Sequence, residues 1–205
     1  MMKRLTAILL VLFPLAAAGQ NIVTDFAKSL SDGCATFGYS YSVSGQVPLS
    51  GSGDIRLQGD AFTMQGDGLE VYCDGTTRWT LDTAAEECYI EGVKAGGLDY
   101  EANPALLVGA VDKAFKLYGT SSRTFNGTKV TEAVLKPVSK DGNITELSLM
   151  MTTAKKPAGL IVRTSDGNTI TVIVKDFLIG GKAALKDFAF DTGKLGSGYI
   201  VTDLR

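Results

Sequence analysis

The sequence predicts a mostly β fold of the α+β class: an incomplete, strongly curved antiparallel barrel of about ten to eleven strands, with helices closing its mouth. Three observations predict it. Short segments of alternating apolar and polar residues recur along the chain. Asp-Gly and Asn-Gly pairs, which favour tight hairpin turns, separate several of them. The 205 residues include 24 glycines, and the apolar fraction of 45% is too high for disorder.

The N-terminal residues 1–19 have the three parts of a secretory signal peptide. A positive start is followed by an apolar run over 5–15 and by small residues over 16–19. The run is too short to span a bilayer. We expect cleavage there, leaving residues 20–205 as a single domain. Because the first cysteine is Cys34, we expect a soluble periplasmic protein that is not lipidated at its N-terminus.

The elements after the signal peptide follow in a regular order. Residues 22–30 place Ile22, Val23, Phe26, Ala27 and Leu30 on one helical stripe, which ends at Asp32-Gly33. Strand segments then recur at short intervals, over 36–43, 53–58, 61–65, 69–73, 77–82 and 87–91. Later strand segments cover 121–125, 129–136, 144–152, 159–164, 169–175 and 187–192.

A helix is predicted between the two sets of strands, over 103–119. Asn103 is a suitable N-cap, and Pro104 suits the first helical position. Its apolar face is formed by Leu106, Leu107, Val111 and Phe115. A closed barrel needs no such helix inside it. The insertion therefore favours an incomplete barrel with this helix in its mouth.

The composition excludes several kinds of chemistry. The chain has no histidine, which removes Ser-His-Asp and Cys-His catalysis and the usual histidine zinc sites. Its charges are scattered, which argues against nucleic acid as a partner. Turns and exposed strand faces account for the acidic residues better than a catalytic carboxylate pair does. We expect no enzymatic activity, no cofactor and no metal.

The three cysteines leave the disulfide state open. Cys73 and Cys88 lie near two strand candidates, and Cys34 follows the first helix and could reach either of them. One disulfide with one remaining thiol is one outcome. The other is that all three are small, buried apolar residues.

The alternating apolar residues are the main functional candidate. They fill an ordinary core, or they line a cavity that the curled sheet and the 103–119 helix enclose for lipid chains. Acyl chains need apolar area and no hydrogen bonds. The candidate cavity residues are Leu57, Phe62, Met64, Leu69, Val71, Trp79, Leu81 and Ile90.

The order of these elements resembles the periplasmic outer-membrane lipoprotein carriers of the LolA family. The likeness covers nearly the whole mature chain. It is carried by an amphipathic helix, GSGDIRL, DAF, LEVYCDGTTRWTLD, the NPALLVG helix, FAF and a final GYIVTDLR. The best segment is the hairpin 69–82, where the family has a similar turn followed by a tryptophan.

The resemblance implies that the cavity holds the acyl chains of lipoproteins. These would come from an inner-membrane lipoprotein-releasing complex and pass to an outer-membrane acceptor. Trp79 and Leu81 would lie on or beside the concave wall, and the 103–119 helix would be part of the lid. Family members latch the lid with an arginine where this chain has residues 58–60, Gln-Gly-Asp, and we expect Arg56 on the other face. A different latch or a different cargo remains open.

We therefore expect a monomeric periplasmic carrier that binds acyl chains without covalent chemistry. One alternative is a protein of the same fold that binds another lipid or hydrophobic ligand. Another is a β-rich scaffold whose concave face binds protein. An envelope hydrolase that uses carboxylates is the weakest alternative, because no positioned nucleophile accompanies the acidic residues.

Overall fold

The computed structural model describes residues 15–45, 48–93, 104–109, 111–139 and 142–205, and their side chains except those of 15–21 and 104–106. This part of the chain contains one α-helix, α1 (Leu15–Ser31). The strands are β1 (Cys34–Ser44), β2 (Leu49–Gln58), β3 (Ala61–Gly66), β4 (Leu69–Cys73), β5 (Thr77–Asp82), β6 (Glu87–Gly92), β7 (Phe115–Phe125), β8 (Thr128–Pro137), β9 (Ile144–Thr152), β10 (Pro157–Thr164), β11 (Thr169–Gly180) and β12 (Ile200–Asp203). Three short 3₁₀ helices are η1 (Pro104–Gly109), η2 (Leu185–Phe188) and η3 (Thr192–Lys194).

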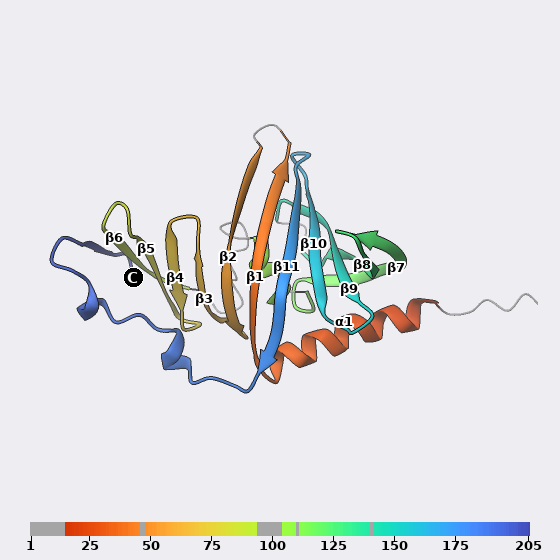
Figure 1. Ribbon diagram of the computed structural model, residues 1–205, viewed down its shortest axis with the longest axis horizontal. Coiled ribbons are helices and arrows are strands. Elements are labelled where there is room, and N and C mark those ends of the chain that lie inside the picture. Colours follow the sequence, from red (N-terminus) through yellow and green to blue (C-terminus); the bar gives the residue numbers. More distant parts are fainter. Residues whose placement is uncertain (1–14, 46–47, 94–103, 110, 140–141) are drawn as a thin grey trace, which may run out of the picture.

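The strands form one sheet in the order β12-β6-β5-β4-β3-β2-β1-β11-β10-β9-β8-β7. Neighbours are antiparallel, except that β12 runs parallel to β6. The sheet is open and curved, and its edge strands are β12 and β7 (Figure 1). Helix α1 contacts both β1 and β7, although four strands separate these two in the sheet order. The sheet therefore curls around α1. No helix in the described ranges is long and apolar enough to cross a membrane.

The Asx-Gly pairs form the hairpin turns that the sequence predicts. Asn126 and Gly127 have φ angles of 44° and 75°, which suit the two central positions of a type I′ turn. Gly75 and Gly167 also have positive φ angles, of 95° and 85°. A side chain disfavours this backbone region, so glycine stabilises these turns. A further Asx-Gly pair of the sequence, at 141–142, includes Asp141, which lies outside the described residues.

One face of the sheet, called the inner face, carries the main hydrophobic cluster. Directly paired residues of antiparallel strands lie on the same face, so Phe37, Ile55, Met64 and Val71 form a row across β1–β4. The cluster continues through β7–β11 and includes side chains from α1 and η1. Phe177 of β11 joins it, with its ring centroid 5.7 Å from that of Phe37.

The helical stripe predicted over 22–30 is confirmed. Val23, Phe26 and Leu30 are buried in the main cluster, and Ile22 packs against it. Residues 1–14 of the predicted signal peptide lie outside the described residues, and α1 begins at Leu15, within its last part.

The opposite face, called the outer face, carries a second cluster at the β4–β6 end of the sheet. Residues 181–199, called the C-terminal segment, cross this face before reaching β12 (Figure 1). The outer cluster consists of Leu81, Cys88 and Ile90 together with Tyr72, Trp79, Phe190, Leu195 and Tyr199. The sheet therefore buries apolar side chains on its inner face in one region and on its outer face in another.

The predicted helix over 103–119 is wrong over most of its length. Only η1 is helical, residues 111–114 form turns, and β7 begins at Phe115. Apolar residues at 107, 111 and 115 fit a helical stripe, but residues 115 and 117 also alternate as in a strand. Pairing with β8 gives β7 backbone hydrogen bonds along one edge and places Phe115 in the main cluster, and together these outweigh the helical pattern.

The predicted last strand over 187–192 is also wrong, and the sheet has twelve strands rather than ten or eleven. Phe188 and Phe190 alternate with polar residues as in a strand. Both instead pack on the outer face, where Phe188 is fully buried and the Phe190 ring lies 5.0 Å from that of Tyr72. The last strand is β12, which lies further along the chain than residues 187–192 and pairs with β6.

Candidate functional site

The inner face of β2–β4 forms the candidate site. Leu57 pairs with Phe62 across β2 and β3, and Met64 pairs with Val71 across β3 and β4. All four side chains are at most 9% exposed and belong to the main cluster. The structure thus brings together four of the eight residues predicted to line a cavity.

The η1 segment, residues 104–109 and 111–113, lies over the inner face, where η1 contacts β1, β10 and β11 and approaches Leu57 of β2 through Gly109. Its side chains Leu107, Val108 and Val111 are 0–1% exposed and belong to the same cluster. Gly109 makes the close approach possible, because a Cβ there would lie 2.7 Å from Cδ2 of Leu57. A larger residue at 109 would require either the Leu57 side chain or η1 to shift.

One of the four residues predicted for the lid helix falls elsewhere, and a second is described only in part. Leu106 belongs to η1, but its side chain lies outside the described residues. Phe115 is buried in the main cluster, but it belongs to β7 and not to a helix. Among the described side chains, Leu107 and Val111 are therefore the predicted lid residues that lie in the η1 segment.

An ion pair connects the end of the η1 segment to the sheet. Lys113 Nζ donates a hydrogen bond to Asp60 Oδ1 at 2.8 Å, and Asp60 lies in the turn between β2 and β3. The two side chains are 50% and 35% exposed, and such pairs contribute about 0–1 kcal/mol. Burial of Leu107 and Val111 is therefore the stronger restraint on the η1 segment.

Gln58 contacts the C-terminal segment and not the η1 segment. Its Nε2 donates to the Ala183 carbonyl at 3.0 Å, and the Ala183 N–H donates to Gln58 Oε1 at 2.7 Å. This reciprocal pair holds the start of the C-terminal segment on the sheet.

Trp79, Leu81 and Ile90 do not join the other predicted cavity residues. The hairpin register pairs Tyr72 with Trp79 and Val71 with Thr80. Trp79 and Leu81 therefore lie on the face opposite Val71, and they pack beneath the C-terminal segment. Alternation within each strand is compatible with either choice of face, and only the register across the turn decides between them.

Leu69 lies on the inner face but at its border. It is the first residue of β4 and pairs with Gly66, and its side chain is half-buried. It stands outside the buried set that forms the main cluster. Leu69 therefore extends the apolar surface without forming its centre.

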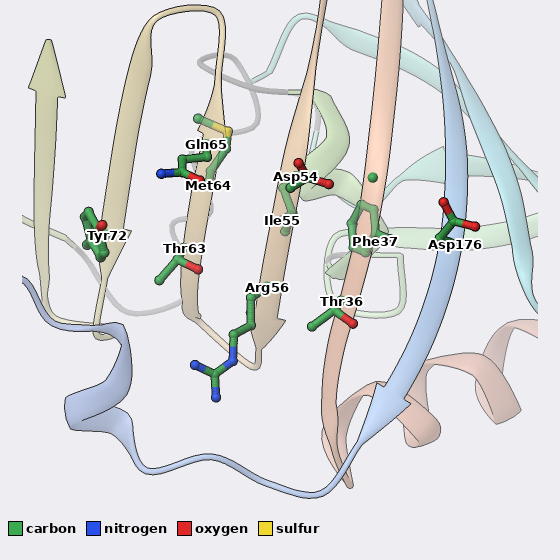
Figure 2. Close-up of a pocket in the computed structure, with 11 residues that line it drawn as sticks. Thr36, Phe37, Asp54, Ile55, Arg56, Thr63, Met64, Gln65, Tyr72 and Asp176 are labelled. Atoms are coloured by element: carbon green, nitrogen blue, oxygen red, sulfur yellow. The ribbon is translucent and has the colours of Figure 1, made fainter. Parts of the chain in front are cut away.

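A polar hollow of about 410 Å³ lies over β1–β4, and sequence reasoning missed it (Figure 2). Asp54, Thr63 and Gln65 contribute to its lining. Arg56 lies there too, with its guanidinium carbon 4.8 Å from the centroid of the Phe188 ring. Arg56 lies on the outer face, opposite Leu57, and Gln58 lies on the same outer face, where it contacts Ala183. The polar residues that alternate with apolar ones along β2 were the available signal.

The three cysteines are all unpaired and buried. Each belongs to a different cluster: Cys73 to the main cluster, Cys88 to the outer cluster and Cys34 to a small cluster with Phe188. Burial raises the pKa of the Cys73 thiol and also that of the Cys88 thiol. They behave as small apolar core residues, which was one of the two outcomes open from the sequence.

Comparison with known proteins finds likeness in structure alone. No family profile matches the sequence, and no curated protein matches it significantly. Among solved structures, an uncharacterized conserved protein from Thermus thermophilus has a TM-score of 0.51 at 12% identity. The match covers 91% of this chain and 99% of the other. The two proteins share a fold.

Two further solved structures have lower scores. A DUF1329 family protein from Desulfovibrio piger matches with a TM-score of 0.49 at 7% identity, over 90% of this chain and all of the other. A LolA superfamily protein from Nitrosomonas europaea matches with a TM-score of 0.45 at 8% identity, over 84% of this chain and 97% of the other. Both matches extend over most of the two chains at 7–8% identity.

Proposed function

We propose that the protein binds the acyl chain of a lipid between the inner face of the sheet and the η1 segment, without covalent chemistry. One observation carries the proposal. The apolar inner face is covered by a six-residue 3₁₀ helix that belongs to no larger helix in the described residues. A helix this short has almost no stability of its own, so side-chain burial holds it in place.

Insertion of an acyl chain under η1 costs little free energy, because both apolar surfaces stay out of water. Leu107, Val108 and Val111 would pack on the chain instead of on the sheet. Each methylene removed from water contributes about 0.8 kcal/mol. A chain of several methylenes therefore packs against both surfaces and also buries its own surface.

The biological cargo follows from the resemblance to the LolA family. In this proposal the acyl chains belong to lipoproteins, which the protein receives from an inner-membrane releasing complex and passes to an outer-membrane acceptor. The protein would act as a monomer in the periplasm after loss of residues 1–19. The half-exposed Asp60–Lys113 pair replaces the family's arginine as the latch.

A protein-binding scaffold is the second candidate, and the edge strand β12 favours it. Ile200 is 62% exposed and Val201 is 46% exposed, and these two side chains point to opposite faces of the edge strand. Exposed edge strands can pair with an extended segment of another protein. In this candidate the inner face is only a core.

Native mass spectrometry with lipid extraction, on protein purified from the periplasm, separates the two candidates. The carrier predicts co-purifying lipoprotein or acyl lipid and saturable binding of an acylated peptide. We expect Leu107→Glu to weaken this binding, because its carboxylate would face the bound chain. Leu178→Glu, at a 60% exposed site on β11, is the control and should bind normally. If the purified protein carries no lipid and does not bind the peptide, the carrier proposal is wrong and the scaffold is the remaining candidate.

A further inference from the structure

A small pocket lies at the end of the η1 segment, where β7, β8 and β9 begin or end. Its volume is about 250 Å³, and Ala114, Phe115, Pro137, Val138 and Ile144 form its apolar lining. Small-molecule sites usually have about 300–1,000 Å³. The pocket therefore holds one chain or part of one chain.

The pocket borders the apolar interior of the protein. Phe115 belongs to the main cluster, and Ala114 and Ile144 pack against it. Val138, which also lines the pocket, is 55% exposed. The pocket thus lies between solvent and the edge of the main cluster, next to the η1 segment.

Lys113 is the only charged side chain among the described residues that line this pocket. Its ammonium group is held by Asp60 at 2.8 Å, and both side chains are partly exposed to water. An exposed ion pair exchanges one partner for another at little cost, because water screens both charges. An anionic group that arrives with an apolar chain can therefore take the place of Asp60.

We propose that this pocket binds a long-chain carboxylate, with its head group on Lys113 and the start of its chain against Phe115 and Ile144. The proposal rests on the proposed function, because the rest of the chain must continue under η1. Charge complementarity selects the head group, and the small volume selects one chain over the two of a phospholipid. An uncharged acyl chain would lack the contact with Lys113.

Binding at this pocket would also loosen the cover of the inner face. Lys113 lies four residues after Gly109, the last residue of η1. Its ion pair with Asp60 ties this part of the chain to the β2–β3 turn. When the carboxylate head group replaces Asp60, that tie is lost. Arrival of the ligand is in this way coupled to displacement of η1.

The test compares dodecanoate with dodecanol, which differ in the charge of the head group. Dissociation constants are measured at pH 8 for the full chain, for Lys113→Gln and for Lys136→Gln. Lys136 is the matched control, because it also pairs with an acidic residue, Glu146, at 2.8 Å. We expect the protein and the control to prefer dodecanoate about two- to fivefold. Lys113→Gln should bind both ligands alike.

A second variant tests the exchange of partners at Lys113. Asp60→Asn frees the lysine and also removes the tie between Lys113 and the β2–β3 turn. Both ligands should gain from the loss of the tie, and the preference for dodecanoate over dodecanol should rise about two- to fivefold. Equal binding of both ligands by the unchanged protein would overturn the carboxylate site and leave the proposed function standing. Failure of both ligands to bind would overturn both. A preference for phosphatidylglycerol vesicles over dodecanoate would also overturn this proposal.

Discussion

The inner face of β2–β4 and the outer face of β4–β6 are both buried, but by different kinds of cover. Over the inner face lies η1, a six-residue helix whose end is tied by one half-exposed ion pair. Over the outer face lies the C-terminal segment, which is fixed by Phe188, by the two hydrogen bonds between Gln58 and Ala183, and by pairing of β12 with β6.

The difference separates a movable cover from a permanent one. The C-terminal segment combines aromatic packing, backbone hydrogen bonds and sheet pairing, so its removal would break several interactions at once. The η1 segment depends mainly on apolar burial, which an apolar ligand can replace. We therefore place ligand binding on the inner face and structural stability on the outer face.

The largest expected effect is on the permanent cover. Phe188→Ala should lower the free energy of unfolding by about 3–5 kcal/mol, because Phe188 is fully buried against Cys34 and Ala61. Urea denaturation measures this loss. Affinity for an apolar ligand should not change at a temperature where the variant remains folded. Loss of affinity in the folded variant would break the division between the two covers.

A smaller effect is expected for the movable cover. Leu107→Ala should lower the free energy of unfolding by about 2 kcal/mol, which is at the low end for buried leucines. The loss is small because η1 can detach locally while the sheet stays folded. Leu149→Ala, at a fully buried site on β9, is the matched control and should cost more. Equal losses in urea denaturation would mean that η1 unfolds only with the whole sheet.

The hairpin between β4 and β5 should show a smaller, pH-dependent effect. Burial raises the pKa of Asp74, but hydrogen bonds from the Thr77 and Thr76 N–H groups outweigh it, and the pKa is lowered overall. The carboxylate therefore stabilises the fold above its unfolded pKa of about 3.9, and this stabilisation is lost as pH falls through the lower folded value.

Asp74→Asn should accordingly lower stability at pH 7 by about 0.5–1.5 kcal/mol. The gap between the two proteins should close as the pH falls below about 3.9. Urea denaturation at several pH values measures the gap. A gap that is constant with pH would show that charge on Asp74 does not matter.

The last prediction is that ligand binding leaves the fluorescence of Trp79 unchanged. Trp79 lies beneath the C-terminal segment, on the face opposite the candidate site, so its fluorescence should stay unchanged when an apolar ligand binds. Phe190→Ala should shift the emission to longer wavelength, because it opens the outer cluster to water. A blue shift on ligand binding would place the ligand on the outer face.

Much of the fold was predictable from local signals. Asn126-Gly127 marks its hairpin because the two residues tolerate positive φ, and the alternating pairs of β2–β4 identify the buried face of those strands. These features depend on residues close in sequence, so a single sequence contains them.

The face of Trp79 and the length of the middle helix were not predictable in this way. Trp79 was expected on the concave wall, but the register across the turn at Gly75 places it on the other face. The stripe at Leu107, Val111 and Phe115 fits a helix, and only pairing with β8 assigns Phe115 to a strand. The first outcome depends on a hairpin register that alternation does not fix, and the second depends on pairing with another strand, β8.

Hydrogen exchange measured by mass spectrometry, with and without saturating dodecanol, tests the central claim most directly. The account predicts that exchange changes at residues 104–109 and along β2–β4, and that residues 185–199 of the C-terminal segment exchange as before. A change confined to the C-terminal segment, or saturable binding with no change at residues 104–109, would contradict it.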